Sequence, residues 1–470
     1  MGLAWGWGRG GAAPQPASRS RVSAAAGTSA LTPSQCQTMD YREALAALAA
    51  SSRPGMRLGL DSTRALCRAL GDPQDQLQGV LVAGTNGKGS VCALVAAIAR
   101  ASGLRVALLT KPHLTSYRER VQLGERPVTE EEFSELAFRT LQAAGRGGVD
   151  ATHHELLTAM GFLAAREWGA EVTVCEVGLG GRLDATNVWD GGVAVVVSVG
   201  LDHQAQLGNT VAQIAAEKAA IFKPGDLAIS GARGEALPVV RAAAAEAGAE
   251  LWQLGEQIDG AWEGAGLRVR TPARELAALS LGVTGQVQGA NAALAVAAAD
   301  GLGRLLGAEM DEGAVRRGLE GARWPGRLEE VASCPAVLVD AAHNPAAVEA
   351  VLGELRAAAR GRRTVLLFGS MGDHDHLGML ARLSSLPLEA AVFTRADAIR
   401  AVDPEVLARE WPGGSERLEP AAAALSRARE LAGPEGAVIA LGSIYLVGEV
   451  MAELGLGLPP DPKVAWRPAF

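Results

Sequence analysis

The chain has few charged residues and few cysteines, and it has no long hydrophobic run. Only 20% of its 470 residues are charged while 48% are hydrophobic, a balance that excludes a largely disordered protein. No apolar run is long enough to span a bilayer, so we expect no membrane association. The formal net charge of −8 argues against broad nucleic-acid binding. Any site for an anionic substrate must therefore be locally basic.

The cysteines lack the pattern of a disulfide framework or of a zinc site. They are odd in number, far apart and without a C-x-x-C pair: Cys36, Cys67, Cys92, Cys175 and Cys334. We expect reduced thiols and a cytoplasmic location. Cys92 and Cys175 lie in apolar runs, which predicts that both are buried.

Residues 1–38 contain no Asp or Glu. A transit peptide has such a composition, but the glycines and prolines of this segment interrupt any amphipathic helix. We therefore expect a disordered extension or a mis-assigned start, with the folded core beginning near Met39.

From there the chain alternates short apolar runs with Ala- and Leu-rich helical stretches. This pattern predicts an α/β fold with a mostly parallel sheet covered by helices on both faces. Its strands are expected at 79–83, 106–109, 172–177, 193–199 and 227–230, with a small antiparallel addition within 232–285 and a helix over about 291–306.

A turn rich in Pro and Gly, Arg323 to Arg327, predicts a domain boundary. A second alternating set follows at 336–340, 364–368, 390–394 and 437–441, which indicates a smaller Rossmann-like domain. This second set has no G-x-G-x-x-G turn, so nothing indicates a dinucleotide there. The expected division is 39–321 for the first domain, 322–326 for a linker and 327–470 for the second domain.

A glycine-rich turn carrying one lysine joins the first expected strand to a helix. It consists of Gly84, Thr85, Asn86, Gly87, Lys88, Gly89 and Ser90. Backbone amides at such a turn bind phosphate, Lys88 reaches the outer phosphates, and Ser90 is suited to ligate Mg²⁺. The spacing departs from the common P-loop, because Gly89 separates the lysine from the serine. The alternative is a glycine-rich turn that only joins a strand to a helix.

Three further segments combine titratable side chains with strand or helix ends. Thr152 and Glu155 begin an apolar helix, where Glu155 is suited either to complete a Mg²⁺ shell with Ser90 or to form a capping box with Thr152. The two roles are compatible. Residues 176–187 follow a buried strand with a loop carrying Arg182 and Asp184, and His203 follows another strand end.

Taken in order, these blocks resemble the folylpolyglutamate synthase and dihydrofolate synthase family of the Mur ligase superfamily, and we expect a bacterial member. The motifs are AGTNGKGS (83–90), PHLTSYRER (112–120), EVGLGGRLDATN (176–187), LDHQAQLGNT (201–210), EKAAI (217–221), WPGRLE (324–329), DAAHNP (340–345), FGSMGDHD (368–375) and GSIYLVGEV (442–450). They span nearly the whole chain from Met39 onward.

The resemblance implies an ATP-dependent ligase that joins L-glutamate to a folate or to dihydropteroate through an acyl phosphate. It places the loop amides and Lys88 on the phosphates, and Ser90, Glu155 and His203 on two Mg²⁺ ions. It also implies a carbamylated Lys218, an adenine contact at Asn291, a phosphate contact at Arg327, a ribose contact at Asp340 and a catalytic role for His343. We further expect substrate contacts from His113, Arg118, Arg182 and Asp184, and a monomer.

The chain departs from the family pattern at a few positions. Lys111 stands where the family usually has Ser or Thr, and His374 stands at a position that is often Lys. The first change lies in the loop expected to cover the pterin. Neither removes an expected phosphate or metal ligand.

Three other functions remain open from the sequence. A cell-wall Mur peptide ligase shares the ATP chemistry, but residues 39–81 are too few for the nucleotide-sugar domain of those enzymes. A P-loop phosphotransferase leaves Arg327 and Asp340 unexplained. A non-catalytic nucleotide-binding protein is expected to lack Glu155, Lys218 or His203, and all three are present.

Overall fold

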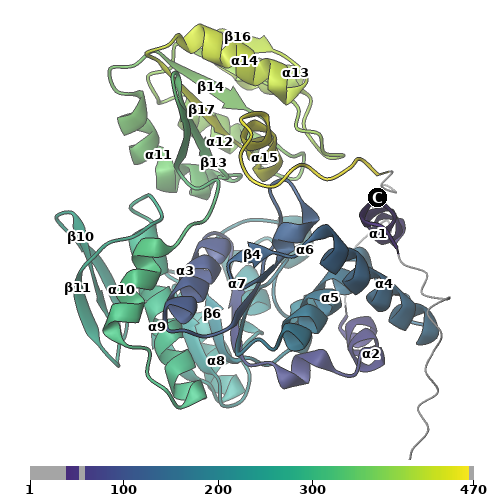
Figure 1. The fold of residues 1–470 in the computed structure, drawn as a ribbon. Helices are drawn as coiled ribbons and strands as arrows, with labels where there is room; N and C mark the ends of the chain where they lie inside the picture. The colour runs from purple at the N-terminus through teal and green to yellow at the C-terminus, as the bar shows by residue number, and fades with distance from the viewer. Residues whose placement is uncertain (1–38, 52–58, 465–470) are drawn as a thin grey trace, which may run out of the picture. The chain divides into compact units, whose positions relative to one another are not determined.

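The structure is a computed structural model that describes residues 39–51 and 59–464. The expectation for residues 1–38 lies outside the described residues. The described chain from Met39 onward forms three sheets, of eight, three and six strands (Figure 1). Within the described part, no helix is both long and apolar enough to cross a membrane.

The eight-stranded sheet is mostly parallel, as expected, and has the order β4-β3-β2-β5-β1-β6-β7-β8. Six neighbouring strands pair in parallel, and β3 and β4 add an antiparallel edge. The strands are β1 (Gly79–Ala83), β2 (Val106–Leu109), β3 (Val121–Leu123), β4 (Arg126–Pro127), β5 (Val172–Glu176), β6 (Gly192–Val196), β7 (Leu227–Ser230) and β8 (Glu250–Gln253).

Alternate residues of β1 face two different apolar cores, because successive side chains of a strand point to opposite faces. Leu81 and Ala83 face one core, and Val80 and Val82 face the other. The helices that contribute to the first core are α1 (Tyr41–Ala50), α2 (Asp61–Ala69), α4 (Glu130–Arg146), α5 (His153–Trp168), α7 (Val211–Ala219) and α8 (Ala236–Ala247). The second core is covered by α3 (Lys88–Ala101), α9 (Gln288–Leu306) and α10 (Glu312–Gly321), which lie side by side in Figure 1.

The antiparallel addition expected within 232–285 is confirmed. It has the order β11-β10-β9 and packs against α9. Its strands are β9 (Asp259–Glu263), β10 (Gly266–Arg270) and β11 (Glu275–Leu279).

The six-stranded sheet carries the second alternating set, in the order β12-β13-β17-β14-β15-β16. Its strands are β12 (Glu329–Ser333), β13 (Ala336–Asp340), β14 (Thr364–Phe368), β15 (Ala390–Phe393), β16 (Ser415–Arg417) and β17 (Ala437–Leu441). Only β12 pairs antiparallel. The helices α11 (Pro345–Ala359), α12 (His376–Leu383) and α13 (Pro404–Glu410) pack on one face, and α14 (Ala421–Ala432) and α15 (Ile444–Glu453) on the other.

Short elements complete the path of the chain. They are the helix α6 (Gln204–Leu207) and the 3₁₀ helices η1 (Pro73–Gln76), η2 (Tyr117–Arg120) and η3 (Ala185–Val188). The loops after β1, β2, β5 and β6 all leave the carboxyl edge of the eight-stranded sheet, where open α/β sheets bind ligands. The candidate residues of four sequence segments are thereby brought to one edge.

Helix α10 approaches α3 so closely that Gly318 has no room for a side chain. A Cβ at Gly318 would lie 2.5 Å from Ile98 Cα, whereas a Cβ at Gly321 on the same helix meets nothing within 4 Å. We expect Gly318→Ala to lower the free energy of unfolding by about 2 kcal/mol, as overpacking does, and Gly321→Ala to change it by under about 1 kcal/mol. Urea unfolding of both variants checks this, and equal stabilities would contradict the close packing.

Candidate active site

A cavity of about 400 Å³ opens at the carboxyl edge of the eight-stranded sheet and is also lined by the six-stranded sheet's loops. Its lining includes the glycine-rich turn and most of the other residues expected at a nucleotide: Thr85, Asn86, Gly87, Lys88, Gly89, Ser90, His203, Asn291, Arg327, Asp340 and His343. Residues as far apart in the sequence as Thr85 and Tyr445 therefore line one cavity.

The glycine-rich turn ends where α3 begins. Gly87 takes a left-handed conformation (φ +85°) as the N-cap of α3, and the first intrahelical bond runs from the Val91 amide to the Gly87 carbonyl. The amides of Lys88, Gly89 and Ser90 thus belong to the first turn, where helical amides have no partner within the helix and bind anions well.

The Lys88 amine bonds only to neutral groups in the described chain. Its Nζ donates to the carbonyls of Gly84 (3.0 Å) and Thr85 (3.1 Å). Neither partner cancels its charge, so the ammonium is positioned for phosphate oxygens.

Two glycines of the turn touch residues from distant parts of the chain. A Cβ at Gly87 would lie 2.8 Å from Asn291 Oδ1 on α9, and one at Gly89 would lie 2.7 Å from the Trp324 indole. The glycine inserted between Lys88 and Ser90 therefore has a physical reason, which is the close approach of Trp324. Sequence spacing alone gave no sign of this contact.

Glu176 lines the cavity and Glu155 does not. Glu176 is buried at the end of β5 and accepts the Lys111 amide (3.1 Å). Burial raises the pKa of this carboxyl, against the nearby positive charges of Lys88, Arg327 and Lys111. Sequence reasoning missed Glu176, although it begins the EVGLGGRLDATN block.

Glu155 instead caps its own helix, so the capping-box interpretation is confirmed. Its carboxylate accepts the Thr152 amide (2.7 Å) and the Thr63 hydroxyl (3.3 Å). Glu155 therefore lies in the cap of α5 and not in the lining of this cavity, and its expected Mg²⁺ role with Ser90 stays a prediction.

The oxygen donors of the cavity suit a hard divalent cation whose coordination shell is completed by phosphate oxygens. No group of three or more His, Cys, Asp or Glu side chains in the described part is arranged to hold a metal by itself. Mg²⁺ commonly takes one or two protein ligands and fills its shell with water and substrate phosphates. The Ser90 hydroxyl and the Glu176 carboxylate beside the glycine-rich turn fit that chemistry.

Lys218 is buried next to the turn. Its amine donates to the Gly84 carbonyl (3.0 Å), and it lines a smaller cavity together with Lys88, His203 and His343. Burial lowers the pKa of Lys218 to about 7, and the charge of Lys88 acts in the same direction. A large fraction of this amine is therefore neutral near pH 7.

The six-stranded sheet contributes buried polar groups from the end of β13. Asp340 accepts the amides of Leu328 (2.9 Å) and Ala342 (2.7 Å), and burial raises the pKa of its carboxyl. The His343 ring lies 5.0 Å from the His374 ring. Burial, followed by the neighbouring His374, lowers the pKa of His343 to about 4, so its imidazole is neutral at pH 7.

Asn344 connects the two sheets directly. Its Oδ1 accepts from Asn86 Nδ2 (3.2 Å), and its Nδ2 donates to Asn86 Oδ1 (3.0 Å) and to Asp202 Oδ2 (3.2 Å). Asn344 also caps α11 by accepting the Ala347 amide (2.9 Å). Its capping role was readable from the Asn-Pro pair, but the contact with Asn86 was not.

The four residues expected to contact substrate do not line this cavity. Arg182 pairs with Glu217 (2.8 Å), and Arg118 lies 3.7 Å from Glu130. Asp184 is buried and accepts the amides of Gly178, Leu179 and Thr186, so it holds the loop after β5 in place. His113 accepts from Arg120 Nε (2.9 Å).

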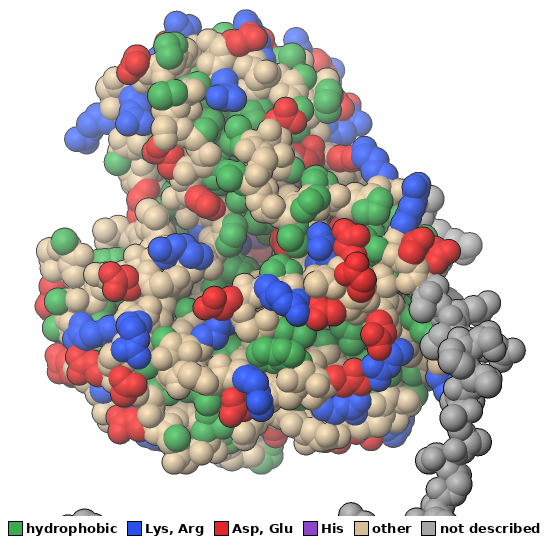
Figure 2. All heavy atoms as spheres, viewed as in Figure 1, with side chains coloured by type: hydrophobic (Ala, Val, Ile, Leu, Met, Phe, Trp, Pro, Cys, Tyr) green, Lys and Arg blue, Asp and Glu red, His purple; other side chains and the backbone are tan. Residues whose placement is uncertain are grey.

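Lys111 and Arg120 do line the cavity. Lys111 Nζ lies 3.4 Å from His154 Nε2, 3.3 Å from Thr158 Oγ1 and 4.0 Å from Asp184 Oδ1. The site is therefore locally basic although the chain is acidic overall. Figure 2 shows the outer face in view covered instead by interspersed basic and acidic side chains.

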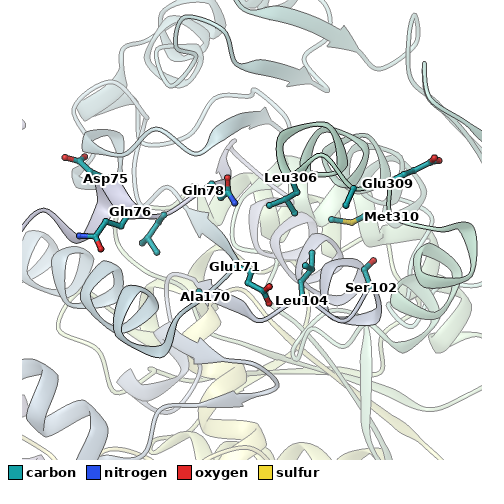
Figure 3. Close-up of a pocket in the computed structure, with 12 residues that line it drawn as sticks. Asp75, Gln76, Gln78, Ser102, Leu104, Ala170, Glu171, Leu306, Glu309 and Met310 are labelled. Carbon is teal, nitrogen blue, oxygen red and sulfur yellow. The ribbon is translucent and has the colours of Figure 1, made fainter. Parts of the chain in front are cut away.

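A second cavity, of about 670 Å³, lies at the opposite end of the same strands. Gln78, Leu104 and Glu171 precede β1, β2 and β5 and line it together with Leu306 and Met310 (Figure 3). It contains none of the residues expected at the nucleotide. The candidate site is therefore the cavity at the carboxyl edge.

Comparison with known proteins agrees with this geometry. The Mur ligase middle domain matches residues 82–299, and the Mur ligase glutamate ligase domain matches residues 326–444. The dihydrofolate synthase/folylpolyglutamate synthase of Escherichia coli is 33% identical over 401 residues, which cover 84% of this chain and 90% of that protein. The chain belongs to the folylpolyglutamate synthase/dihydrofolate synthase family.

Longer relatives in this family also match. A probable bifunctional folylpolyglutamate synthase/dihydropteroate synthase of Haloferax volcanii is 36% identical over 437 residues, which cover 87% of this chain and 50% of that protein. The chain thus spans about half the length of this relative, and about half that of one from Halobacterium salinarum. Since bacterial and haloarchaeal relatives both match, the expected bacterial origin stays a prediction.

Solved structures of the family share the fold. Escherichia coli FolC in complex with DHPP and ADP has a TM-score of 0.81 at 31% identity, covering 90% of this chain and 99% of that one. The Yersinia pestis bifunctional enzyme with Mn, AMPPNP and L-glutamate bound has a TM-score of 0.80 at 31% identity, covering 89% and 100%. Family members therefore bind adenine nucleotides and divalent metal.

Variants of Glu155 and Glu176 give a matched test of which carboxylate binds the metal. We expect Glu176→Gln to weaken Mn²⁺ binding in the presence of AMPPNP by at least about tenfold, because a carboxylate ligand is lost. Glu155→Gln should leave it within about twofold, since Gln also forms capping boxes. Electron paramagnetic resonance titration of free Mn²⁺ checks both, and the reverse order of effects would contradict the site.

Proposed function

We propose that this protein is an ATP-dependent ligase that adds L-glutamate to tetrahydrofolates, and also to dihydropteroate. One observation carries the proposal. The glycine-rich turn and Ser90 share a single cavity with Arg327 and Asp340 from the other sheet. A P-loop phosphotransferase would leave Arg327 and Asp340 unexplained. The family relationship favours the folate enzymes over the cell-wall ligases.

The reaction requires positioning and neutralisation of charge. A carboxylate oxygen of the acceptor attacks the γ-phosphorus of ATP and ADP leaves; the glutamate amine then attacks the acyl phosphate carbon and phosphate leaves. Lys88 and the first-turn amides of α3 hold the phosphates, and Arg327 adds a second cation. Removal of Lys88 should therefore slow both steps.

In this proposal Asn291 contacts adenine and Asp340 contacts ribose. Asn291 packs against Gly87, which supports a place for Asn291 beside the nucleotide. The neutral His343 lines the same cavity beside Lys88, which supports a place near the reacting groups.

We propose Ser90, Glu176 and His203 as protein ligands of two Mg²⁺ ions, with Glu176 in place of Glu155. When bound, these ions neutralise the charge that develops on the transferred phosphoryl group. His203 is an unusual partner for a hard ion, but it lines both cavities beside Lys88.

We also propose that Lys218 is carbamylated. Carbamylation requires a neutral amine, and burial supplies one by lowering the pKa of Lys218 to about 7. The neutral form dominates above this pKa and is lost below it, so carbamate should increase as the pH rises from about 6 to about 8.

¹³C nuclear magnetic resonance of the protein in ¹³C-bicarbonate tests this. We expect one carbamate signal in the unmodified chain and in the exposed-lysine control Lys463→Arg, and none in Lys218→Arg. A signal that persists in Lys218→Arg would contradict the assignment.

The division 39–321, 322–326 and 327–470 stands as a proposal that the separate cores of the first and last sheets support. A monomer and a cytoplasmic location are part of the same proposal. The four cysteines of the described part are unpaired, and the expected burial of Cys92 and Cys175 is confirmed.

Glutamate incorporation tests the proposed function. With MgATP and [¹⁴C]glutamate, we expect product with tetrahydrofolate and with dihydropteroate, and at least about a 100-fold loss of rate in Lys88→Ala with unchanged circular dichroism. Incorporation with tetrahydrofolate alone would reduce the proposal to a folylpolyglutamate synthase. No incorporation with either acceptor would contradict it.

A further inference from the structure

The last described segment of the chain lies against a loop of the first sheet. We name residues 455–464, which follow α15, the C-terminal strap. Asp461 accepts the Tyr41 hydroxyl (2.6 Å) and the Tyr117 amide (2.8 Å), and its own amide donates to the Thr115 carbonyl (3.2 Å). The strap therefore joins the N-terminal helix α1, the loop of residues 112–120 and the six-stranded sheet.

The loop held by Asp461 leads into the candidate active site. Tyr117 begins η2, and its ring lies 4.2 Å from the His113 ring and 4.7 Å from the Arg120 guanidinium carbon. Arg120 Nε donates to His113 Nδ1 (2.9 Å), and Arg120 lines the cavity that contains Lys88. Asp461 thus holds the backbone of Tyr117 at the start of η2, and the Tyr117 ring contacts Arg120, which lines the cavity.

The strap also forms a wall of an adjoining space. A cavity of about 680 Å³ is lined by Leu456, Gly457 and Leu458 of the strap and by Thr115 of the loop. It shares Pro112, Arg327 and Ile444 with the nucleotide cavity. A displacement of the strap would therefore change the border of the active site.

We propose that Asp461 is a positioning residue of the acceptor site, which holds the loop of residues 112–120 so that Arg120 faces the anionic acceptor. This proposal rests on the proposed function and deepens it. The lining of the cavity that the strap borders includes no residue of the glycine-rich turn, so the effect of the strap should fall on the acceptor rather than on ATP.

The alternative explanation is that hydrogen bonds within the loop of residues 112–120 are sufficient to fix it. Glu119 accepts the amides of Leu114 (2.7 Å), Thr115 (2.9 Å) and Ser116 (2.9 Å), and it closes a capping box with Ser116. These bonds fix the first half of the loop. The Tyr117 amide lies beyond them and donates to the Asp461 carboxylate (2.8 Å).

Hydrogen exchange tests the positioning without any assay of activity. We expect the peptide covering residues 113–121 to exchange about tenfold faster in Asp461→Ala, because the hydrogen bond from the Tyr117 amide to the Asp461 carboxylate is lost. Asp461→Asn should give a smaller increase, since the side-chain oxygen of Asn still accepts the Tyr117 amide. The control Lys463→Ala removes an exposed ion pair with Asp397 in the same strap and should leave the peptide unchanged.

Kinetics test the consequence for the acceptor. We expect Asp461→Ala to raise the KM for tetrahydrofolate about tenfold, with the KM for ATP within about twofold and Lys463→Ala unaffected. Unchanged exchange, or equal increases in both KM values, would overturn the proposal. A wild-type chain without ligase activity would contradict the proposed function instead, and the exchange experiment would still decide whether Asp461 holds the loop.

Discussion

The closeness of three separate segments to one glycine-rich turn constrains the whole active site. Gly87 and Gly89 admit no side chain, because Asn291 of α9 and Trp324 occupy the space that a Cβ would need. Asn86, between them and β1, exchanges hydrogen bonds with Asn344 at the start of α11. The glycine-rich turn is thus contacted by α9 of the first domain, by the segment between the sheets and by the second sheet.

These contacts gather cations in one cavity of a chain that is acidic overall. Five cations and three carboxylates line one cavity: Lys88, Lys111, Arg120, Arg327 and Arg400, and Glu176, Asp340 and Asp373. Desolvation inside the cavity strengthens these interactions compared with those on the mixed outer surface. The low pKa of the Lys218 amine has the same origin, since it is buried beside Lys88.

The central strands and the phosphate turn could be predicted from the sequence because both have strong local patterns. Buried parallel strands such as β1 are continuous apolar runs, and the glycine-rich turn follows one of them directly. The strands β3, β4, β8, β12 and β16 were not predicted. All but β3 lie at the edge of a sheet, where propensity says little.

The sequence expectations and the structure differ at the site where tertiary contacts decide the position of a side chain. Glu155 lies in the first turn of α5, and Glu176 ends β5. Only the fold shows that Glu176 lines the cavity and that Glu155 contacts Thr63. Arg118 and Arg182 lie in recognisable motifs but pair with carboxylates outside the cavity. Asn344 and Asp461 act across large sequence separations, which no local pattern reports.

The central claim is that this cavity transfers the γ-phosphoryl group of ATP to the acceptor's carboxylate before glutamate is joined. The most direct test uses tetrahydrofolate labelled with ¹⁸O in the carboxylate that reacts, with mass spectrometry of the phosphate released. The account predicts one ¹⁸O in each phosphate formed per amide bond, because the labelled oxygen leaves with phosphorus. Phosphate without ¹⁸O, together with normal amide formation, would contradict it.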